Sequence, residues 1–428
     1  MRKQAQTNIK KPNALIYALF YLLIYPIVKL CFRLEVDRSK VQVPEGAFVV
    51  VSNHQSFMDF VLVMLAMYPH RLNAVTAQKF FFYPPLNWLL PLMGCIPKNL
   101  FESDPRAIKG ILSVIKRGGK LLLFPEGRCT VDGGYMGMNK ATGKLIKKLG
   151  VPVIDCHIEG SYTCMPFWRR GLRFGRERVT LTTLFTAEDT QSLSVDEINH
   201  RLDRALSGAN TAPSTKPFRV FRARKLAEGL ETILYYCPKC EQEFTLVTEH
   251  NNIRCTACGN AATMNREAKL IPAPGSVIPE SAHAWYREQV SYEMKFLRED
   301  EVLIEAEVVV RMAAQAGLAA CGSGTLRLDH TGWYFRGRLH DEDAALHFPI
   351  ETVPALPFDP RDNFQIYANG QFYAFTPTDN LLACAKYATR GECAYWRFAH
   401  TVQMTSAAAC GFARGREETV SRTENAWN

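Results

Sequence analysis

Residues 47–59 read AFVVVSNHQSFMD, an apolar run that ends in a polar segment carrying a histidine and an aspartate. His54 and Asp59 lie five positions apart, and at roughly 100° per residue such a pair cannot share one face of a helix. A turn from a strand into a helix would bring them together. The carboxylate could then hold one imidazole nitrogen while the other takes up a proton, as a general base requires. Taken alone, the pair fits equally a hydrogen-bonded turn histidine without a catalytic role.

A second apolar run ends in the same way, where residues 121–123 lead into FPEGR at residues 124–128. Strand-like and amphipathic stretches alternate around both runs. We expect strands at residues 48–52, 120–124, 152–157 and 179–185, and helices at residues 60–67, 105–117 and 139–149. This alternation predicts an α/β sheet core in which the polar segments form loops at the ends of strands.

These segments together resemble the glycerolipid acyltransferase family, of the 1-acyl-sn-glycerol-3-phosphate acyltransferase type. The first family signature, Asn-His-x-Ser-x-x-Asp, is matched by Asn53, His54, Ser56 and Asp59. The third, Phe-Pro-Glu-Gly followed by Thr-Arg-Ser, is matched at residues 124–127, but RCT follows at residues 128–130. The fourth appears as VPVI at residues 151–154. In the second, GCIP at residues 94–97 is followed by Lys98 rather than by the expected arginine. The resemblance covers roughly residues 35–210.

The resemblance implies transfer of a fatty acyl group from a thioester, on coenzyme A or acyl carrier protein, to the hydroxyl of a lysophospholipid such as 1-acylglycerol 3-phosphate. His54 would remove the hydroxyl proton, and Asp59 would orient the ring and stabilise the imidazolium. Four residues would bind the acceptor: Lys98, Glu126, Gly127 and Arg128. Of these, Arg128 suits a phosphate because a guanidinium can grip it with two hydrogen bonds. Cys129 either fills space beside this site or acts through its thiol.

The N-terminal segment, residues 1–34, is expected to be a membrane anchor. Its apolar run over residues 14–28 is interrupted by Pro26 and Lys29, and basic residues flank it on both sides. We prefer a helix that lies in the membrane interface to one that spans the bilayer. Thirteen cysteines, four of them in two CxxC pairs, suit a reducing compartment and hence the cytoplasmic face of the membrane.

The acyltransferase domain is predicted at residues 35–212 and a basic linker at residues 213–232. The linker fits either a solvated helix or a contact with anionic lipid headgroups. A zinc ribbon is predicted at residues 233–264, where four thiolates could close a tetrahedral structural zinc site: Cys237, Cys240, Cys255 and Cys258. Unliganded thiols in a small loop domain are the alternative.

A β-rich domain is predicted at residues 280–410, after a Pro- and Gly-containing linker. Strand-like runs at residues 302–310, 324–328, 332–336, 345–349, 364–368 and 371–376 are joined by turn sequences at residues 329–332 and 368–370. The outline resembles the pleckstrin-homology or GRAM type. The polar residues 411–428 are expected to be disordered.

Two other classes of function compete with the enzyme. The chain could be a catalytically silent, membrane-bound recruitment protein that uses its zinc ribbon and β domain to hold a partner. A nucleic-acid role would rest on the ribbon and on the net charge of +9, but the apolar N-terminal segment favours lipid over nucleic acid. The partners expected are therefore a phospholipid membrane, a lysophospholipid acceptor and acyl-coenzyme A or acyl carrier protein.

Overall fold

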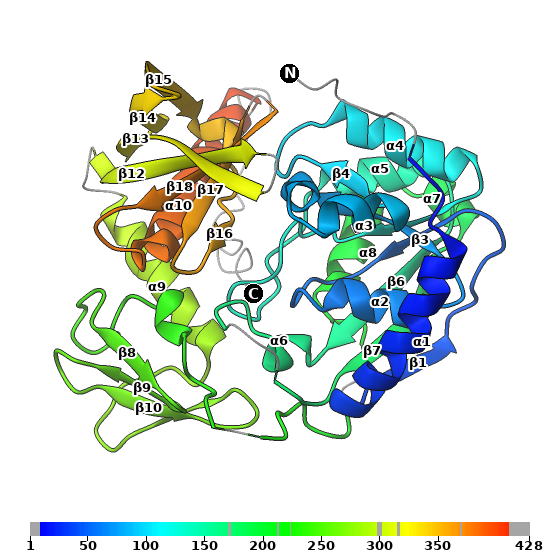
Figure 1. Ribbon diagram of the computed structural model, residues 1–428, viewed down its shortest axis with the longest axis horizontal. Helices are drawn as coiled ribbons and strands as arrows, with labels where there is room; N and C mark the ends of the chain where they lie inside the picture. The colour runs from blue at the N-terminus through cyan, green and yellow to red at the C-terminus, as the bar shows by residue number, and fades with distance from the viewer. Residues whose placement is uncertain are drawn as a thin grey trace.

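The computed structural model describes residues 9–169, 173–211, 214–222, 224–297, 302–314, 317–368 and 370–410, with side chains as far as residue 401. The predicted tail, residues 411–428, lies outside this range. Figure 1 shows the chain as two halves, with the N-terminal half on one side and the C-terminal half on the other.

The N-terminal half is built on a seven-stranded sheet in the order β1-β7-β6-β2-β5-β3-β4. Neighbouring strands are parallel except β6 and β7, which are antiparallel. The strands are β1 (Glu35–Lys40), β2 (Phe48–Val51), β3 (Leu72–Ala77), β4 (Ile96–Lys98), β5 (Lys120–Leu123), β6 (Val153–Glu159) and β7 (Arg178–Phe185). The expected α/β core is therefore confirmed, as a mixed sheet.

Helices cover both faces of this sheet because its central strands bury side chains on alternate sides. In β2, Phe48 and Val50 pack with α1 (Ala14–Cys31) and α2 (Asp59–Met67). Val49 and Val51 point to the opposite face and pack with α4 (Pro105–Lys116), α5 (Ala141–Leu149) and α8 (Val195–Leu206). The short helices are η1 (Gln78–Phe82), α3 (Leu86–Leu92), α6 (Ser161–Cys164) and α7 (Ala187–Ser192).

Helix α1 packs along the flank of this half with one side only. Tyr17 and Val28 are buried against the core, and the Tyr17 hydroxyl accepts a hydrogen bond from the backbone N–H of Leu72. The outer side is a row of exposed apolar residues: Leu15, Leu19, Leu22, Leu23, Ile27 and Leu30. Within the described ranges, α1 is the one helix whose length and composition would allow it to cross a membrane.

A small antiparallel sheet follows, in the order β11-β10-β9-β8. Its strands are β8 (Leu246–Glu249), β9 (Asn252–Cys255), β10 (Ala261–Met264) and β11 (Leu270–Pro272), and η2 (Leu230–Thr232) precedes them. The Pro-containing segment after residue 265 is thus part of this sheet, because β11 pairs with β10.

The C-terminal half is a second seven-stranded sheet, entirely antiparallel, in the order β15-β14-β13-β12-β18-β17-β16. It is formed by β12 (Val302–Ala314), β13 (Gly317–Asp329), β14 (Gly332–Leu339), β15 (Glu342–Pro349), β16 (Phe358–Asp359), β17 (Asn363–Ala368) and β18 (Gln371–Pro377), with η3 (Ile350–Thr352) after β15. The predicted antiparallel sheet is therefore confirmed.

Two helices accompany the second sheet, α9 (Ala282–Phe296) and α10 (Ala383–Cys410). Helix α10 was not expected from the sequence. It packs closely at Gly391, where an added Cβ would lie 2.6 Å from Leu356 Cδ1 and 2.7 Å from Trp333 Cζ2. The next residue, Glu392, contacts the N-terminal half of the chain at Arg128.

Candidate active site and cysteine cluster

The two polar signatures meet at the carboxyl ends of β2 and β5. These strands are parallel neighbours, with Val51 in register with Leu123, so the residues that follow them emerge at the same edge of the sheet. Open α/β sheets bind ligands in this position. The signature residues of the two strands therefore share one site, although they lie some 70 residues apart in sequence.

His54 is oriented by Asp59, the first residue of α2. Its Nδ1 lies 2.9 Å from Asp59 Oδ2, and the Asp59 side chain is fully buried. Ser56 lies in the turn between His54 and Asp59. It donates two hydrogen bonds to the Asp59 carboxylate, from its backbone N–H at 2.7 Å and from its hydroxyl at 3.2 Å. The Ser56 hydroxyl also lies 2.5 Å from that of Ser161. With Nδ1 engaged in this way, Nε2 is the ring atom that can exchange a proton with a substrate.

Two side chains lie against the His54 ring. Phe124 stacks on it with ring centroids 4.2 Å apart. The Cys129 sulfur is 3.5 Å from Nε2 and 3.6 Å from Nδ1. A sulfur almost equidistant from both nitrogens must lie over the ring face, because an in-plane position would collide with a ring carbon. Cys129 therefore does not occupy the in-plane direction in which Nε2 accepts a proton.

The charge of His54 is set by opposing influences. Burial disfavours the imidazolium, whereas the adjacent Cys129 sulfur and Asp59 carboxyl group favour it, and the net effect raises the pKa of His54 well above its usual range. A reaction that needs the neutral ring will be favoured at higher pH.

Glu126 contacts the backbone of His54 and that of the loop after its own signature. One carboxylate oxygen accepts the N–H of His54 at 2.8 Å, and the other accepts the N–H of Met136 at 3.2 Å. Burial raises the pKa of Glu126 to about 7. Gly127 follows with a φ of 77°, a left-handed conformation that favours glycine. Through these hydrogen bonds Glu126 holds the turn that carries His54 in position.

Arg128 is paired with the C-terminal half. Its guanidinium grips the Glu392 carboxylate with two hydrogen bonds of 2.5 and 2.8 Å, and both side chains are largely buried. Lys98, at the end of β4, donates to the carbonyl oxygens of Asn99 and Glu102, and burial lowers its pKa. Within the described residues, neither cation hydrogen-bonds to His54.

The loop after Arg128 is fixed from both halves of the chain. The Thr130 N–H donates to the His54 carbonyl at 2.8 Å, and Asp132 Oδ2 lies 2.8 Å from His283 Nδ1 of α9. We did not single out Asp132, His283 or Glu392 from the sequence. The Asp132-Gly133-Gly134 turn could have pointed to the first, but nothing local marks the other two.

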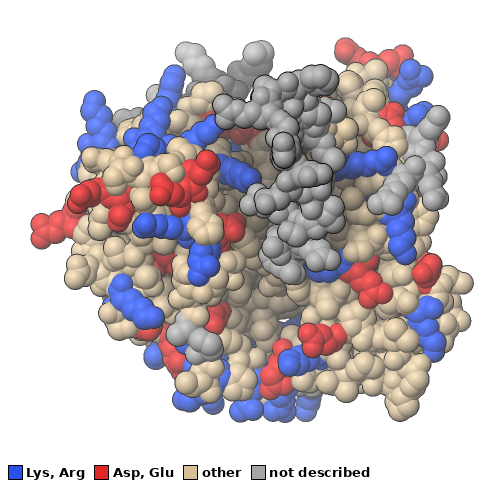
Figure 2. All heavy atoms as spheres, turned by 180° about the vertical axis from the view of Figure 1, so that it is seen from behind, with Lys and Arg blue, Asp and Glu red and all other residues tan. Residues whose placement is uncertain are grey.

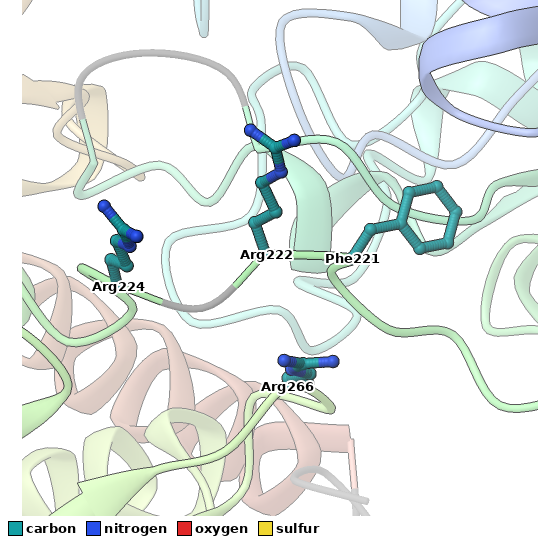
Figure 3. Close-up of a pocket in the computed structure, with 4 residues that line it drawn as sticks. All are labelled: Phe221, Arg222, Arg224 and Arg266. Carbon is teal, nitrogen blue, oxygen red and sulfur yellow. The ribbon is translucent and has the colours of Figure 1, made fainter.

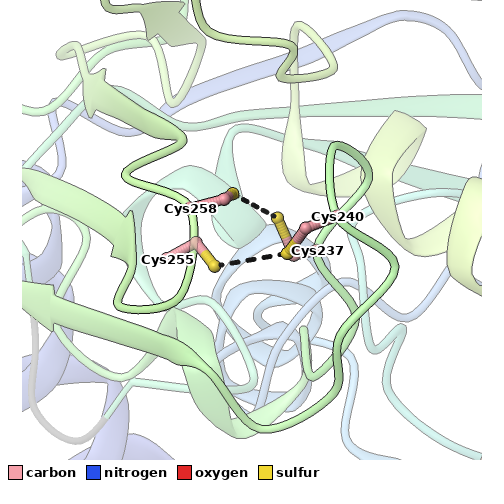
Figure 4. Close-up of side chains that lie close together, drawn as sticks. All are labelled: Cys237, Cys240, Cys255 and Cys258. Carbon is pink, nitrogen blue, oxygen red and sulfur yellow. Dashed lines mark hydrogen bonds between the residues drawn. The ribbon is translucent and has the colours of Figure 1, made fainter.

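The four cysteines of the CxxC pairs come together between the loops that precede β8 and β10 (Figure 4). Their sulfur atoms all lie within 4.8 Å of one another, and the closest cross-loop pairs, Cys237 with Cys258 and Cys240 with Cys255, are 3.7 Å apart. A tetrahedral ion with metal–sulfur bonds of about 2.3 Å needs sulfurs about 3.8 Å apart. The cluster therefore fits a metal held by four thiolates.

Groups around the cluster fit the same role. The Asn260 amide donates to Cys237 Sγ at 3.7 Å, and the Thr245 hydroxyl lies 3.2 Å from Cys255 Sγ. Hydrogen bonds of this kind orient thiolate ligands. All four positions are cysteines, so a tetrahedral metal here would have no vacant coordination position for a substrate.

Comparison with known proteins places the first of these two sites in a family. Residues 33–159 match the acyltransferase family model and so form an acyltransferase-family domain. Similar curated proteins are a chloroplastic 1-acyl-sn-glycerol-3-phosphate acyltransferase of Brassica napus, 31% identical over 138 residues, and another of Arabidopsis thaliana, 31% identical over 139 residues. The matched region is 31% of this chain and covers 39% and 38% of these relatives.

Among solved structures, the crystal structure of the 1-acyl-sn-glycerophosphate acyltransferase PlsC from Thermotoga maritima is similar, with a TM-score of 0.40 and 20% identity. The match covers 47% of this chain and 82% of that protein.

Proposed function

We propose that this chain, with its acyltransferase-family domain at residues 33–159, moves a fatty acyl group from an acyl-coenzyme A or acyl carrier protein thioester to the hydroxyl of a lysophospholipid. The observation that carries the proposal is the His54–Asp59 pair, 2.9 Å apart at the carboxyl end of β2. This pair leaves Nε2 of His54 available for proton transfer.

In the proposed reaction His54 acts as the general base. Its Nε2 takes the proton of the acceptor hydroxyl as the oxygen attacks the thioester carbonyl, and the carbon–sulfur bond then breaks. The proton passes from the imidazolium to the departing thiolate, so the products are an ester and a free thiol. Asp59 stabilises the imidazolium meanwhile. The reaction needs neutral His54, so its rate should rise with pH through the raised pKa of that residue.

The acceptor we propose is 1-acylglycerol 3-phosphate, the acceptor that the names of the curated relatives indicate. Arg128 and Lys98 are the cations that we propose for its phosphate. Since Glu392 holds Arg128 with two hydrogen bonds, phosphate binding there would replace a carboxylate by a phosphate on the same guanidinium. That exchange keeps the buried arginine paired.

We also propose that α1 lies in the membrane interface on the cytoplasmic side. One side of α1 is packed on the protein and the other is an apolar row, which fits a helix lying along the surface better than a free span. The described cysteines are not joined in disulfides, which fits a reducing compartment. Finally, we propose that the four-cysteine cluster holds structural zinc, and that the C-terminal sheet with α10 is a module of the pleckstrin-homology or GRAM type.

The test is acyl transfer by purified, detergent-solubilised protein, with labelled acyl-coenzyme A or acyl carrier protein and a panel of lysophospholipids. Loss of a general base typically costs about 100-fold or more, so His54→Ala and Asp59→Asn should each abolish most of the product. His200→Ala, at an exposed position of α8, is the matched control and should retain activity. Near-wild-type rates in both site variants would refute the proposed base. No product from wild type on any acceptor would favour a recruitment protein instead.

A further inference from the structure

A second cationic site lies outside the acyltransferase signatures, where the segment after α8 meets the small sheet. Phe221, Arg222, Arg224 and Arg266 line a hollow of about 570 Å³. Figure 3 shows the three arginine side chains extending from two segments of the chain around it. Arg266 belongs to the turn between β10 and β11, and its carbonyl accepts the N–H of Val220 at 2.9 Å. The segment after α8 and the turn between β10 and β11 are therefore hydrogen-bonded to each other at this hollow.

Among the described residues, the three arginines have no acidic partner. All are exposed, and within the described ranges none of them forms an ion pair with an aspartate or a glutamate. Three guanidinium groups line one hollow without a carboxylate partner among the described residues, so an anion would find positive charge there from two segments of the chain. Guanidinium groups match phosphate in geometry as well as in charge.

The hollow adjoins the end of α1. The Arg33 guanidinium, two residues after α1, lies over the Phe221 ring at 4.3 Å. Phe174 joins the two parts, since its carbonyl accepts the Phe221 N–H at 2.8 Å and its ring packs edge-on against Phe32. The Phe174 side chain is also half exposed. The end of α1 and the arginine hollow are therefore in contact through Arg33, Phe174 and Phe221.

The distribution of charge agrees with this arrangement. Figure 2 shows basic side chains close together along the lower edge of the molecule, and in Figure 1 α1 ends at the same edge. A surface with an apolar helix flank and adjoining cations suits a bilayer, whose acyl chains take up the apolar residues while its headgroups meet the charges. A soluble phosphate compound would account for the cations but not for the exposed leucines.

We infer that the hollow lined by Arg222, Arg224 and Arg266 binds the phosphate of an anionic phospholipid headgroup in the membrane on which α1 lies. This site would fix the orientation of the protein on the bilayer. The inference rests on the membrane association in the proposed function and is independent of acyl transfer.

The test is vesicle flotation of the full chain. Vesicles are made of phosphatidylcholine alone, of phosphatidylcholine with phosphatidylglycerol, or of phosphatidylcholine made equally anionic with oleate. Each basic residue near an anionic surface contributes a factor of about five to binding. Charge alone should therefore make the double variant Arg222→Gln/Arg266→Gln bind both kinds of anionic vesicle about 25-fold more weakly than wild type, and phosphate recognition should make the loss on phosphatidylglycerol vesicles clearly larger than the loss on oleate vesicles.

The matched control is Arg336→Gln/Arg338→Gln, which makes the same change in net charge at two exposed positions of β14, away from the edge of the molecule where α1 ends (Figure 1). It should bind within about two-fold of wild type, because charges beyond the Debye length of about 8 Å are screened. Equal losses in the two double variants, or no loss in either, would overturn the inference. So would an equal loss on oleate vesicles, which would indicate charge without phosphate recognition.

Two further measurements complete the design. Thermal unfolding of both double variants should match wild type, since all four arginines are exposed. Free coenzyme A, which also carries phosphates, should not displace wild type from vesicles; displacement would assign the hollow to the acyl donor and refute the lipid site. Flotation needs no turnover, so wild type that floats without acylating any lysolipid would contradict the proposed reaction and leave this inference intact.

Discussion

Replacing Glu392 by alanine should destabilise the protein more than any change on its surface. The Glu392 carboxylate accepts two hydrogen bonds from Arg128, at 2.5 and 2.8 Å, and a third from the backbone N–H of Leu356 at 2.8 Å. The side chains of Arg128 and Glu392 are only 13% and 4% exposed. The alanine variant would leave a buried guanidinium without its counter-charge and a buried N–H without its acceptor.

The magnitude follows from what stays buried. Removing one partner of a buried ion pair costs about 3–5 kcal/mol, because the remaining charge is uncompensated. Replacing both partners by apolar residues removes that charge and is often close to neutral. Glu392→Ala should therefore lower the free energy of unfolding by about 3–5 kcal/mol. Arg128→Leu/Glu392→Leu should recover the part due to the unpaired charge and keep a loss of about 1–3 kcal/mol from the Leu356 N–H, which still lacks its acceptor.

The assay is urea unfolding followed by far-ultraviolet circular dichroism and by tryptophan fluorescence, which should coincide if the transition is two-state. Asp362→Ala is the control, because it breaks the Arg311–Asp362 pair of 2.6 Å, in which both side chains are more than a third accessible. That change should cost less than about 1 kcal/mol. A loss from Glu392→Ala no larger than the control's would refute the reasoning.

Three further predictions concern other parts of the molecule. Cys129→Ala should keep acyl transfer within about five-fold of wild type, because the sulfur lies over the His54 ring and not in line with Nε2; a loss of about 100-fold would instead show a chemical role for the thiol. Cys237→Ser should lower the metal content measured by mass spectrometry together with the midpoint of thermal unfolding, and unchanged values would argue against a structural metal. Burial raises the pKa of Asp155 to about 7 in the folded protein, whereas in the unfolded chain this carboxyl group loses its proton near about pH 4. The free energy of unfolding therefore falls as the pH rises from about 4 to about 7. Asp155→Asn should remove this fall and gain up to about 4 kcal/mol at pH 8, whereas equal pH profiles of unfolding for variant and wild type would contradict the assignment.

The local parts of the site could be predicted from the sequence because they depend on short-range rules. The spacing of His54 and Asp59 calls for a strand-to-helix turn, and the structure has that turn between β2 and α2. The two CxxC pairs likewise predict a four-sulfur cluster. The catalytic and acceptor-binding roles of these residues stay predictions until activity is measured.

The long-range parts could not be predicted. Three strands of the first sheet were not predicted from the sequence, namely β1, β3 and β4. Each of them is short or has no clear alternation of apolar and polar residues. The pairing of Arg128 with Glu392 depends on how α10 packs at Gly391, which no local pattern encodes. The sequence therefore indicated a phosphate-binding arginine at a position where the structure has an arginine already paired with a carboxylate.

The link between Arg128 and Glu392 also has a consequence for synthesis. The two residues are 264 positions apart, and a ribosome adds about 5–20 residues per second. The loop that carries Arg128 thus leaves the ribosome roughly 13–50 seconds before the carboxylate that neutralises it. Throughout that interval the newly made acyltransferase half contains an arginine whose carboxylate partner has not yet been synthesised. The contacts of Arg128 with Glu392 and of Asp132 with His283 form only after much of the chain has been translated, so a chain that ends before residue 283 would carry the whole signature without either contact.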